Sequence, residues 1–361
     1  MKKIHNDYKH HKKQYLMIVS AFLLYLSTYI LHHISFLIEH VYARTLFPIT
    51  NQLLSTLTSF IPFSIAEFLY VSLYLLAFAL ILSILIQGIK GKWLKAIREA
   101  LVIISVIYLG FMMLWGLNYY RQPLWVSLNM PVESSKQQLI STVDTLTQMT
   151  NQLGVRVSRD EQGIMKLSIP RQDFLKDDFL QMNSLLKPIP FLQGVYGNAK
   201  PVLLSRYMLY TQISGMYFPF TAEANVNMLI PDATFPFTVL HELAHQRGIA
   251  LEDEANFVAF VTAMNHPSLD VQYSGAIMAL RSSINALARV DLALAQSKVE
   301  MIDSSVRLDM QSIRDFWAQY DGTVGTVSNQ INDTYLKGNQ QKDGVASYGR
   351  MVDLLVRYLH P

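Results

Sequence analysis

The chain of 361 residues is predicted to fold as an α-helical membrane anchor of three transmembrane helices, followed by an α+β, mainly helical domain with a small sheet. Three observations lead to this prediction. Hydrophobic residues make up 51% of the chain, charged residues only 16%, and the mean hydropathy is +0.21, which is too apolar for an ordinary soluble protein. Long runs without Asp, Glu, Lys or Arg precede residue 120. From Arg121 onward, the composition is that of a soluble domain.

The anchor is predicted to begin after a short basic arm, residues 1–14. Runs at about 15–38, 68–86 and 100–117 are each long enough to cross roughly 30 Å of hydrocarbon as a helix. No small-residue cleavage site follows the first run, which favours a retained anchor. Residues 41–67 contain Pro48 and Pro62 and predict an interfacial or re-entrant amphipathic segment. The expected units are therefore the arm, an anchor at 15–120 and a domain at 121–361.

Positive charge predicts how the anchor is oriented. The arm and the linker between the second and third spans are rich in Lys and Arg, whereas the loop between the first two spans has only Arg44. Arm and linker are therefore expected in the cytoplasm, and three spans then place 121–361 outside. The prediction is a multi-pass protein of the cell membrane with a cytoplasmic N-terminus and the lipid bilayer as a partner. If one run is instead a buried helix, the topology inverts.

Composition also excludes several kinds of site. The chain has no cysteine, which rules out disulfides, thiolate metal ligands and a cysteine nucleophile. The net charge is only +3, and no basic stripe in the domain indicates a nucleic-acid partner. The sequence does not indicate an oligomeric state.

The stretch HELAHQRGIALEDEAN, residues 241–256, predicts a metal site. Two histidines four apart on a helix point the same way, so His241 and His245 can hold one Zn²⁺ with Glu242 beside them. The third ligand is open between Glu252 and Glu254. Glu252 is favoured, because Asn256 then follows it by one helical turn and can orient a ligating histidine.

The connection between the two motif helices must be tight. Gly248 follows His245 closely and could end the first helix in a left-handed conformation, so that the two helices face each other. The alternative to a metal site is a satisfied helical histidine pair beside a solvated acidic turn. Apolar residues flank the motif at 239–240 and 257–260, however, which would bury both helices where unpaired charge is costly.

These residues carry two resemblances. HExxH followed by E-x-x-A-N resembles the gluzincin clan of zinc peptidases, although the ligand spacing is shorter here than in many members. That resemblance implies a zincin-like metallopeptidase domain whose third ligand is the glutamate that opens the second string. A wider set of stretches resembles a bacterial membrane-protein family known as domain of unknown function 3810. These stretches are WGLNYYRQPL (115–124), SGMYFPFTAEANVN (214–227), the motif itself and DGVASYGRMVDLL (343–355).

Further site residues are predicted around the motif. Residues 201–210 and 213–220 predict strands of a small sheet just before the motif helix. Residues 224–227 are the candidate edge strand for an extended peptide, with Glu223 and Asn225 as substrate contacts or, alternatively, turn and strand-end polar groups. Tyr348 and Arg350 are candidates for stabilising an oxyanion. The alternative is that Tyr348 packs and Arg350 caps or pairs at the surface.

Together these features predict a membrane-anchored zinc metallopeptidase that cleaves a peptide or protein substrate outside the membrane. Zinc would activate a water, and Glu242 would act as the general base. The alternative is a non-catalytic scaffold or binding module with a structural metal. Intramembrane proteolysis is disfavoured, because the motif lies outside any run long enough to span.

Overall fold

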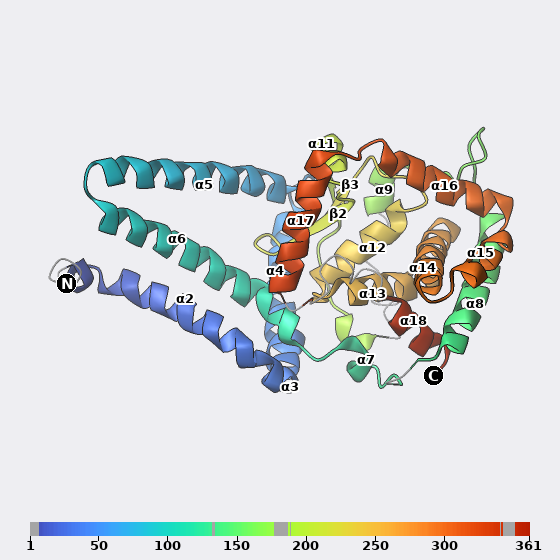
Figure 1. Cartoon of the computed structure of the whole chain (residues 1–361), viewed down its shortest axis with the longest axis horizontal. Coiled ribbons are helices and arrows are strands. Elements are labelled where there is room, and N and C mark those ends of the chain that lie inside the picture. The colour runs from blue at the N-terminus through green and yellow to red at the C-terminus, as the bar shows by residue number, and fades with distance from the viewer. Residues whose placement is uncertain (1–6, 132–133, 177–186, 188, 340, 342–350) are drawn as a thin grey trace.

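The computed structural model describes residues 7–131, 134–176, 187, 189–339, 341 and 351–361. It is mostly helical, with long helices extending from one side of a larger domain that contains a small sheet (Figure 1). Three helical stretches are long and apolar enough to cross a membrane: Lys12–Ser59, Ile65–Ile89 and Trp93–Leu114. The predicted combination of a helical anchor and a mainly helical domain is therefore confirmed at this level.

The first of these stretches does not stop near residue 38. Helix α2 (Lys12–Leu31) continues through η1 (His32–Ile34), α3 (Ser35–Leu37), the π-helical η2 (Ile38–Leu46) and α4 (Phe47–Ser59). Pro48 does not break this path, because it lies in the first turn of α4, where the missing N–H costs little. Phe47, Asn51 and Ser55 of α4 are buried. Within 41–67, predicted to be interfacial or re-entrant, residues 41–59 are therefore helical and have one buried face.

Helices α5 (Ile65–Ile89) and α6 (Trp93–Leu114) complete the anchor. They are joined by a turn at Gly91 and separate toward the domain (Figure 1). The described N-terminal residues and this turn lie at the end of the anchor that is far from the domain. The arrangement has the described part of the basic arm and the basic linker at one end, as the charge pattern predicts. Which side of a membrane the domain occupies stays a prediction.

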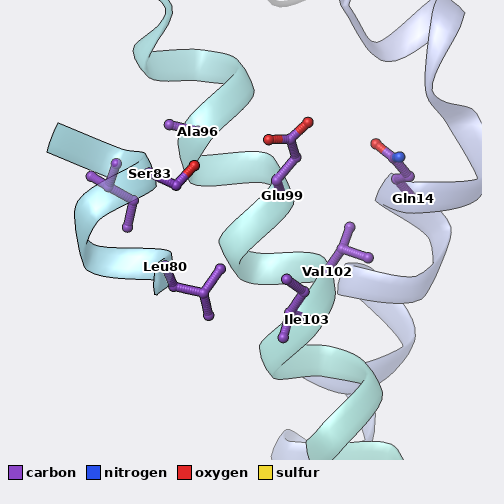
Figure 2. A pocket seen from close by; sticks show the side chains of 8 residues that line it. Gln14, Leu80, Ser83, Ala96, Glu99, Val102 and Ile103 are labelled. Atoms are coloured by element: carbon purple, nitrogen blue, oxygen red, sulfur yellow. The ribbon is translucent and has the colours of Figure 1, made fainter. Parts of the chain in front are cut away.

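A pocket of about 320 Å³ lies between the helices at that far end. Figure 2 shows Gln14 of α2, Ser83 of α5 and Glu99 of α6 around it. The amide of Gln87 donates to Ser83 Oγ at 2.9 Å and to Glu99 Oε2 at 3.1 Å, which ties α5 to α6. This pocket belongs to the packing of the anchor, because none of its lining residues comes from the domain.

The domain packs its helices around α12 (Phe235–Gln246), α13 (Glu252–Met264) and α14 (Leu269–Val290). Leu240, Phe257 and Tyr273, one from each helix, are fully buried in the core between them. The other helical elements are η3 (Gly116–Tyr120), α7 (Leu124–Ser127), α8 (Lys136–Gly154), α9 (Arg171–Lys176), η5 (Pro190–Leu192), α11 (Ser205–Tyr210), α15 (Leu292–Glu300), α16 (Ser304–Ala318), α17 (Thr323–Gly338) and α18 (Met351–Leu359).

The small sheet lies before α12, as predicted, but its strand order differs from expectation. The order is β1 (Lys200–Val202), β3 (Glu223–Asn227) and β2 (Gly215–Phe218), with β3 parallel to β1 and antiparallel to β2. Residues 224–227 thus belong to the central strand, and the prediction that they form an edge was wrong. Strands β1 and β2 are the two edges of this sheet. Of the two, β2 is the one that packs next to α12. Residues 205–210 form helix α11 instead of a strand.

Candidate metal centre

Helix α12 presents the first part of the motif. Pro236 lies in its first turn, where proline is tolerated, and the helix ends at Gln246. Gly248 then adopts a φ of +89°, which confirms the predicted left-handed turn. A Cβ atom at this position would also lie 2.8 Å from the ring of Phe47. The turn therefore requires glycine, and it brings the start of α13 back to α12.

The turn is held from the other side by Arg121 and by two anchor residues, Glu39 and Asn51. Arg121 donates from Nη1 to the Gly248 carbonyl at 2.9 Å, and its Nε and Nη2 each donate to Glu39 at 2.8 Å. Both charged groups are buried, and a buried ion pair is tolerated when its hydrogen bonds are satisfied in this way. Asn51 of α4 donates to the Gln246 carbonyl and accepts from the Tyr217 hydroxyl at 2.7 Å. The anchor thus fixes the end of the motif helix.

The two histidines and Glu252 form a compact group. His241 Nε2 lies 3.0 Å from His245 Nε2 and 3.1 Å from Glu252 Oε2, and the distance between His245 Nε2 and Glu252 Oε2 is 3.5 Å. Donor atoms bound to a tetrahedral zinc ion at about 2.0–2.1 Å are roughly 3.3 Å apart. The three donors therefore have the mutual spacing that one such ion requires.

Hydrogen bonding sets the tautomer of one histidine. The Nδ1 atom of His245 lies 2.6 Å from the Ile249 carbonyl, which can only accept, so Nδ1 carries the proton. In a neutral imidazole, this leaves the lone pair on Nε2, directed at the other two donors. The hydrogen bond thus fixes the orientation of the His245 ring, and its acceptor belongs to the same turn that Arg121 holds.

The charges of the group favour a bound cation. Burial would raise the pKa of the Glu252 carboxyl, but His245 and His241 hold it well below its usual range. Burial would lower the pKa of His245, yet the Glu252 and Glu242 carboxylates raise it to about 9. The two carboxylates thus favour positive charge at His245. A divalent cation could supply that charge in place of protons.

Glu242 lies beside this group and against the sheet. Its side chain is only 4% exposed, and burial raises its pKa to about 7. Oε2 has no hydrogen-bond partner among the described residues. The other oxygen lies over Gly215 of β2, where a Cβ atom would be 2.5 Å from it. A carboxyl group with a pKa near neutrality and one free oxygen is suited to accept and return a proton.

The structure separates the two glutamates that the sequence left open. Glu252 faces the histidines, whereas the Glu254 carboxylate accepts from the backbone N–H of Leu124 at 2.6 Å. Burial raises the pKa of Glu254 to about 8. Asn256 lies one turn beyond Glu252 and is half-buried, without a hydrogen-bond partner among the residues that the structure describes. Its role in orienting a histidine stays a prediction.

The two predicted substrate contacts are both buried. Glu223 accepts from the backbone N–H groups of Ile65 and Ala66 at 3.2 and 2.8 Å and pairs with the Lys200 ammonium at 2.5 Å. It therefore stabilises the start of α5, where negative charge complements the helix dipole. The amide of Asn225 donates to the Met216 and Glu223 carbonyls, both at 3.1 Å. Glu223, at the start of β3, matches the alternative of a strand-end polar group, whereas Asn225 lies in the middle of the strand. Substrate contact by either residue stays a prediction.

Tyr348 and Arg350, predicted to stabilise an oxyanion, lie outside the described residues. Two other tyrosines, Tyr119 and Tyr335, are close enough to the group of His241, His245 and Glu252 for the Glu252 charge to act on them. The hydroxyls of Tyr119 and Tyr335 are 2.9 Å apart, and the Trp115 Nε1–H donates to Tyr119 at 3.4 Å. The Trp115 ring meets the His245 ring edge-on, with centroids 6.0 Å apart. Burial raises the pKa of Tyr119 well above its ordinary value, so it remains a hydrogen-bond donor.

A family model described as protein of unknown function DUF3810 matches residues 42–356, which is most of the chain. The chain belongs to this family. No curated protein and no solved structure matches the chain. The part matched by the DUF3810 model includes His241, His245, Glu252, Glu242 and both tyrosines.

Sequence reasoning did not single out Tyr119 and Tyr335. Tyr119 follows directly after the third apolar run, and Tyr335 falls in a helix without a motif. A signal was present at Tyr119, which lies in the WGLNYYRQPL stretch of the DUF3810 resemblance. Nothing local marks Tyr335, because its position near the site depends on a contact across 216 residues of chain.

Proposed function

We propose that this chain is a membrane-anchored zinc metallopeptidase that hydrolyses peptide bonds outside the cytoplasmic membrane of a bacterium. The observation that carries the proposal is the group of three donors, 3.0–3.5 Å apart, with Glu242 between this group and an edge strand. Two imidazoles and a carboxylate favour zinc among the common divalent metals.

Each residue has a specific role in the proposed reaction. His241, His245 and Glu252 would hold the zinc ion, which supplies an activated water and polarises the scissile carbonyl. Glu242 would accept the proton of the attacking water through its free Oε2 and return it to the leaving amine. The hydroxyls of Tyr119 and Tyr335 are additional candidates for donating to the developing oxyanion, besides Tyr348 and Arg350.

The sheet supports a peptide as the substrate. Among the described residues, strand β2 pairs with β3 on one side only, and Gly215 at its start contacts Glu242. An extended peptide that adds to the free side of β2 would form backbone hydrogen bonds next to the general base. Because such binding uses the backbone of the substrate, it does not by itself define a cleavage sequence.

Metal analysis tests the site directly. The full chain, purified in detergent, should contain about one zinc per chain by mass spectrometry, as a single three-ligand site requires. His245→Ala and Glu252→Ala should lose the metal. Glu254→Gln is the matched control and should keep it, because a glutamine oxygen can still accept from the Leu124 N–H. A folded wild-type chain without metal would contradict the proposal.

Glu242→Gln separates catalysis from a structural metal. The variant should retain zinc but lose cleavage of a fluorogenic peptide library, because an amide cannot take the proton of the attacking water. Cleavage by the wild type that persists in Glu242→Gln would contradict the role of Glu242. Absence of cleavage in both proteins, with zinc bound, would favour the alternative of a non-catalytic scaffold with a structural metal.

A further inference from the structure

Helix α17 exposes an apolar stripe. Val324, Val327, Ile331 and Tyr335 follow at helical spacing, and Val327 and Ile331 are 47% and 66% exposed. A second side of the helix is buried and contains Gly325 and Leu336. A third, polar side carries the exposed residues Thr326, Gln330, Thr334 and Lys337.

Tyr335 shows in which direction this stripe faces. Its ring meets Phe111 of α6 edge-on, with centroids 6.4 Å apart, and its hydroxyl bonds to Tyr119 just after α6. Residues on one side of a helix face the same way, so Val327 and Ile331 lie on the side where α6 joins the domain. Figure 1 shows α17 at the anchor end of the domain, running crosswise to α5.

A second exposed apolar group lies at the start of α5. The carboxylate of Glu67, in the first turn of α5, accepts from the backbone N–H groups of Leu203 and Leu204 at 2.8 and 2.7 Å. The side chains of Leu203, Leu204 and Tyr207 are nevertheless exposed. They lead into α11, which neighbours the start of α17: the Gln212 amide donates to Asp321. We call the exposed residues of both groups the juxtamembrane face: Leu203, Leu204, Tyr207, Val324, Val327 and Ile331.

We propose that the juxtamembrane face rests on the lipid bilayer, with α17 lying in the plane of the headgroup region. An exposed apolar surface of this extent is unusual on a soluble domain and indicates a partner. The bilayer is the expected partner, because the face is continuous with α5 and α6, which are apolar enough to cross it. An amphipathic helix with an apolar stripe beside a polar side lies in a membrane interface in this way.

This docking has a consequence for the metal group. Helix α17 contributes both the lipid-facing Ile331 and, one turn later, Tyr335, which bonds to Tyr119 beside the group. The donors would therefore lie close to the membrane surface. If the proposed peptidase function is correct, the substrate is a polypeptide held at that surface. The docking itself does not depend on catalysis, so the two proposals fail separately.

The absence of cysteine from the chain allows a direct test. Val327→Cys and Ile331→Cys each introduce a single thiol on the apolar stripe, and Thr326→Cys and Gln330→Cys place one on the polar side of the same helix. The full-length variants would be labelled with the fluorophore NBD and reconstituted in vesicles of phosphatidylcholine and phosphatidylglycerol. Doxyl-labelled lipid would serve as the quencher.

We expect blue-shifted emission and at least twofold stronger quenching by doxyl lipid at 327 and 331 than at 326 and 330. Equal, water-like emission and no quenching at all four positions would overturn the proposal. Blue-shifted emission at 327 and 331 that doxyl lipid does not quench, with energy transfer between labelled copies, would assign the face to a second copy of the chain and also overturn it. Two positions on each side guard against a single variant that perturbs α17.

Discussion

Gly215 and Glu242 are in direct contact, although they belong to different elements. A Cβ atom at Gly215 of β2 would lie 2.5 Å from Oε1 and 2.9 Å from Cδ of Glu242 on α12. The absence of a side chain at this strand position therefore makes the space in which the carboxylate lies. Because β2 is an edge of the sheet, the same contact joins the proposed general base to the proposed peptide-binding strand.

Gly215→Ala should displace Glu242 without removing the metal ligands. We expect zinc content to stay at the wild-type level and peptide cleavage to fall at least about tenfold, since a positioned general base contributes roughly 10²–10⁴-fold. Gly322→Ala is the matched control, because a Cβ there meets nothing within 4 Å and its φ of 173° suits any residue. Full cleavage activity in Gly215→Ala would contradict the assigned position of Glu242.

Gly248→Ala should destabilise the turn between the two motif helices. Its φ of +89° costs a residue with a side chain about 1–2 kcal/mol, and the new Cβ would clash with Phe47. We expect a lower unfolding temperature together with reduced zinc content.

The control for this prediction is Gly91→Ala in the turn between α5 and α6. Gly91 has a similar φ of +71°, but a Cβ there would meet nothing within 4 Å. The Gly91→Ala variant should therefore lose only the stability that the backbone conformation costs, and it should keep zinc. An equal loss of zinc in both variants would mean that the position of Gly248 beside the metal group is not the cause.

The Tyr119 and Tyr335 hydroxyls should be energetically coupled. Tyr119→Phe and Tyr335→Phe each remove one side of the 2.9 Å hydrogen bond, so the double variant should lose less stability than the sum of the two singles. We expect a coupling energy of about 1 kcal/mol, the usual net value of such a bond. Chemical denaturation of the four proteins measures it. Strictly additive losses would show that the contact contributes nothing.

Asp309→Ala should strongly destabilise the domain, at a position unrelated to the metal. The buried Asp309 carboxylate accepts from the Met165 N–H at 2.8 Å, from Arg159 Nη1 at 3.1 Å and from the Tyr273 hydroxyl. Its removal leaves a largely buried guanidinium unpaired, which costs about 3–5 kcal/mol.

Asp315→Ala is the matched control on the same helix. Asp315 is exposed, so this change should cost less than about 0.5 kcal/mol. Thermal unfolding compares the two variants. A small loss for Asp309→Ala would show that water replaces the carboxylate without penalty.

Features that depend on near neighbours in the chain followed from the sequence alone. Three apolar runs of sufficient length predicted the anchor, because helix length and hydrophobicity are local properties. The four-residue spacing of His241 and His245 places both on one side of any helix, so their convergence needed no further information. Gly248 was predicted to be left-handed for the same kind of local reason.

Features that depend on how elements pack required the tertiary structure. Glu252 and Glu254 are nearly equivalent along the chain. Only the packing of α13 against α12 and Leu124 determines that Glu252 faces the histidines and that Glu254 bonds to Leu124 instead. Strand β3 became central because β1 pairs with it from 25 residues earlier in the chain. Tyr335 reaches the site across 216 residues. Such pairings are set by the packing of the whole core, which no stretch of sequence encodes by itself.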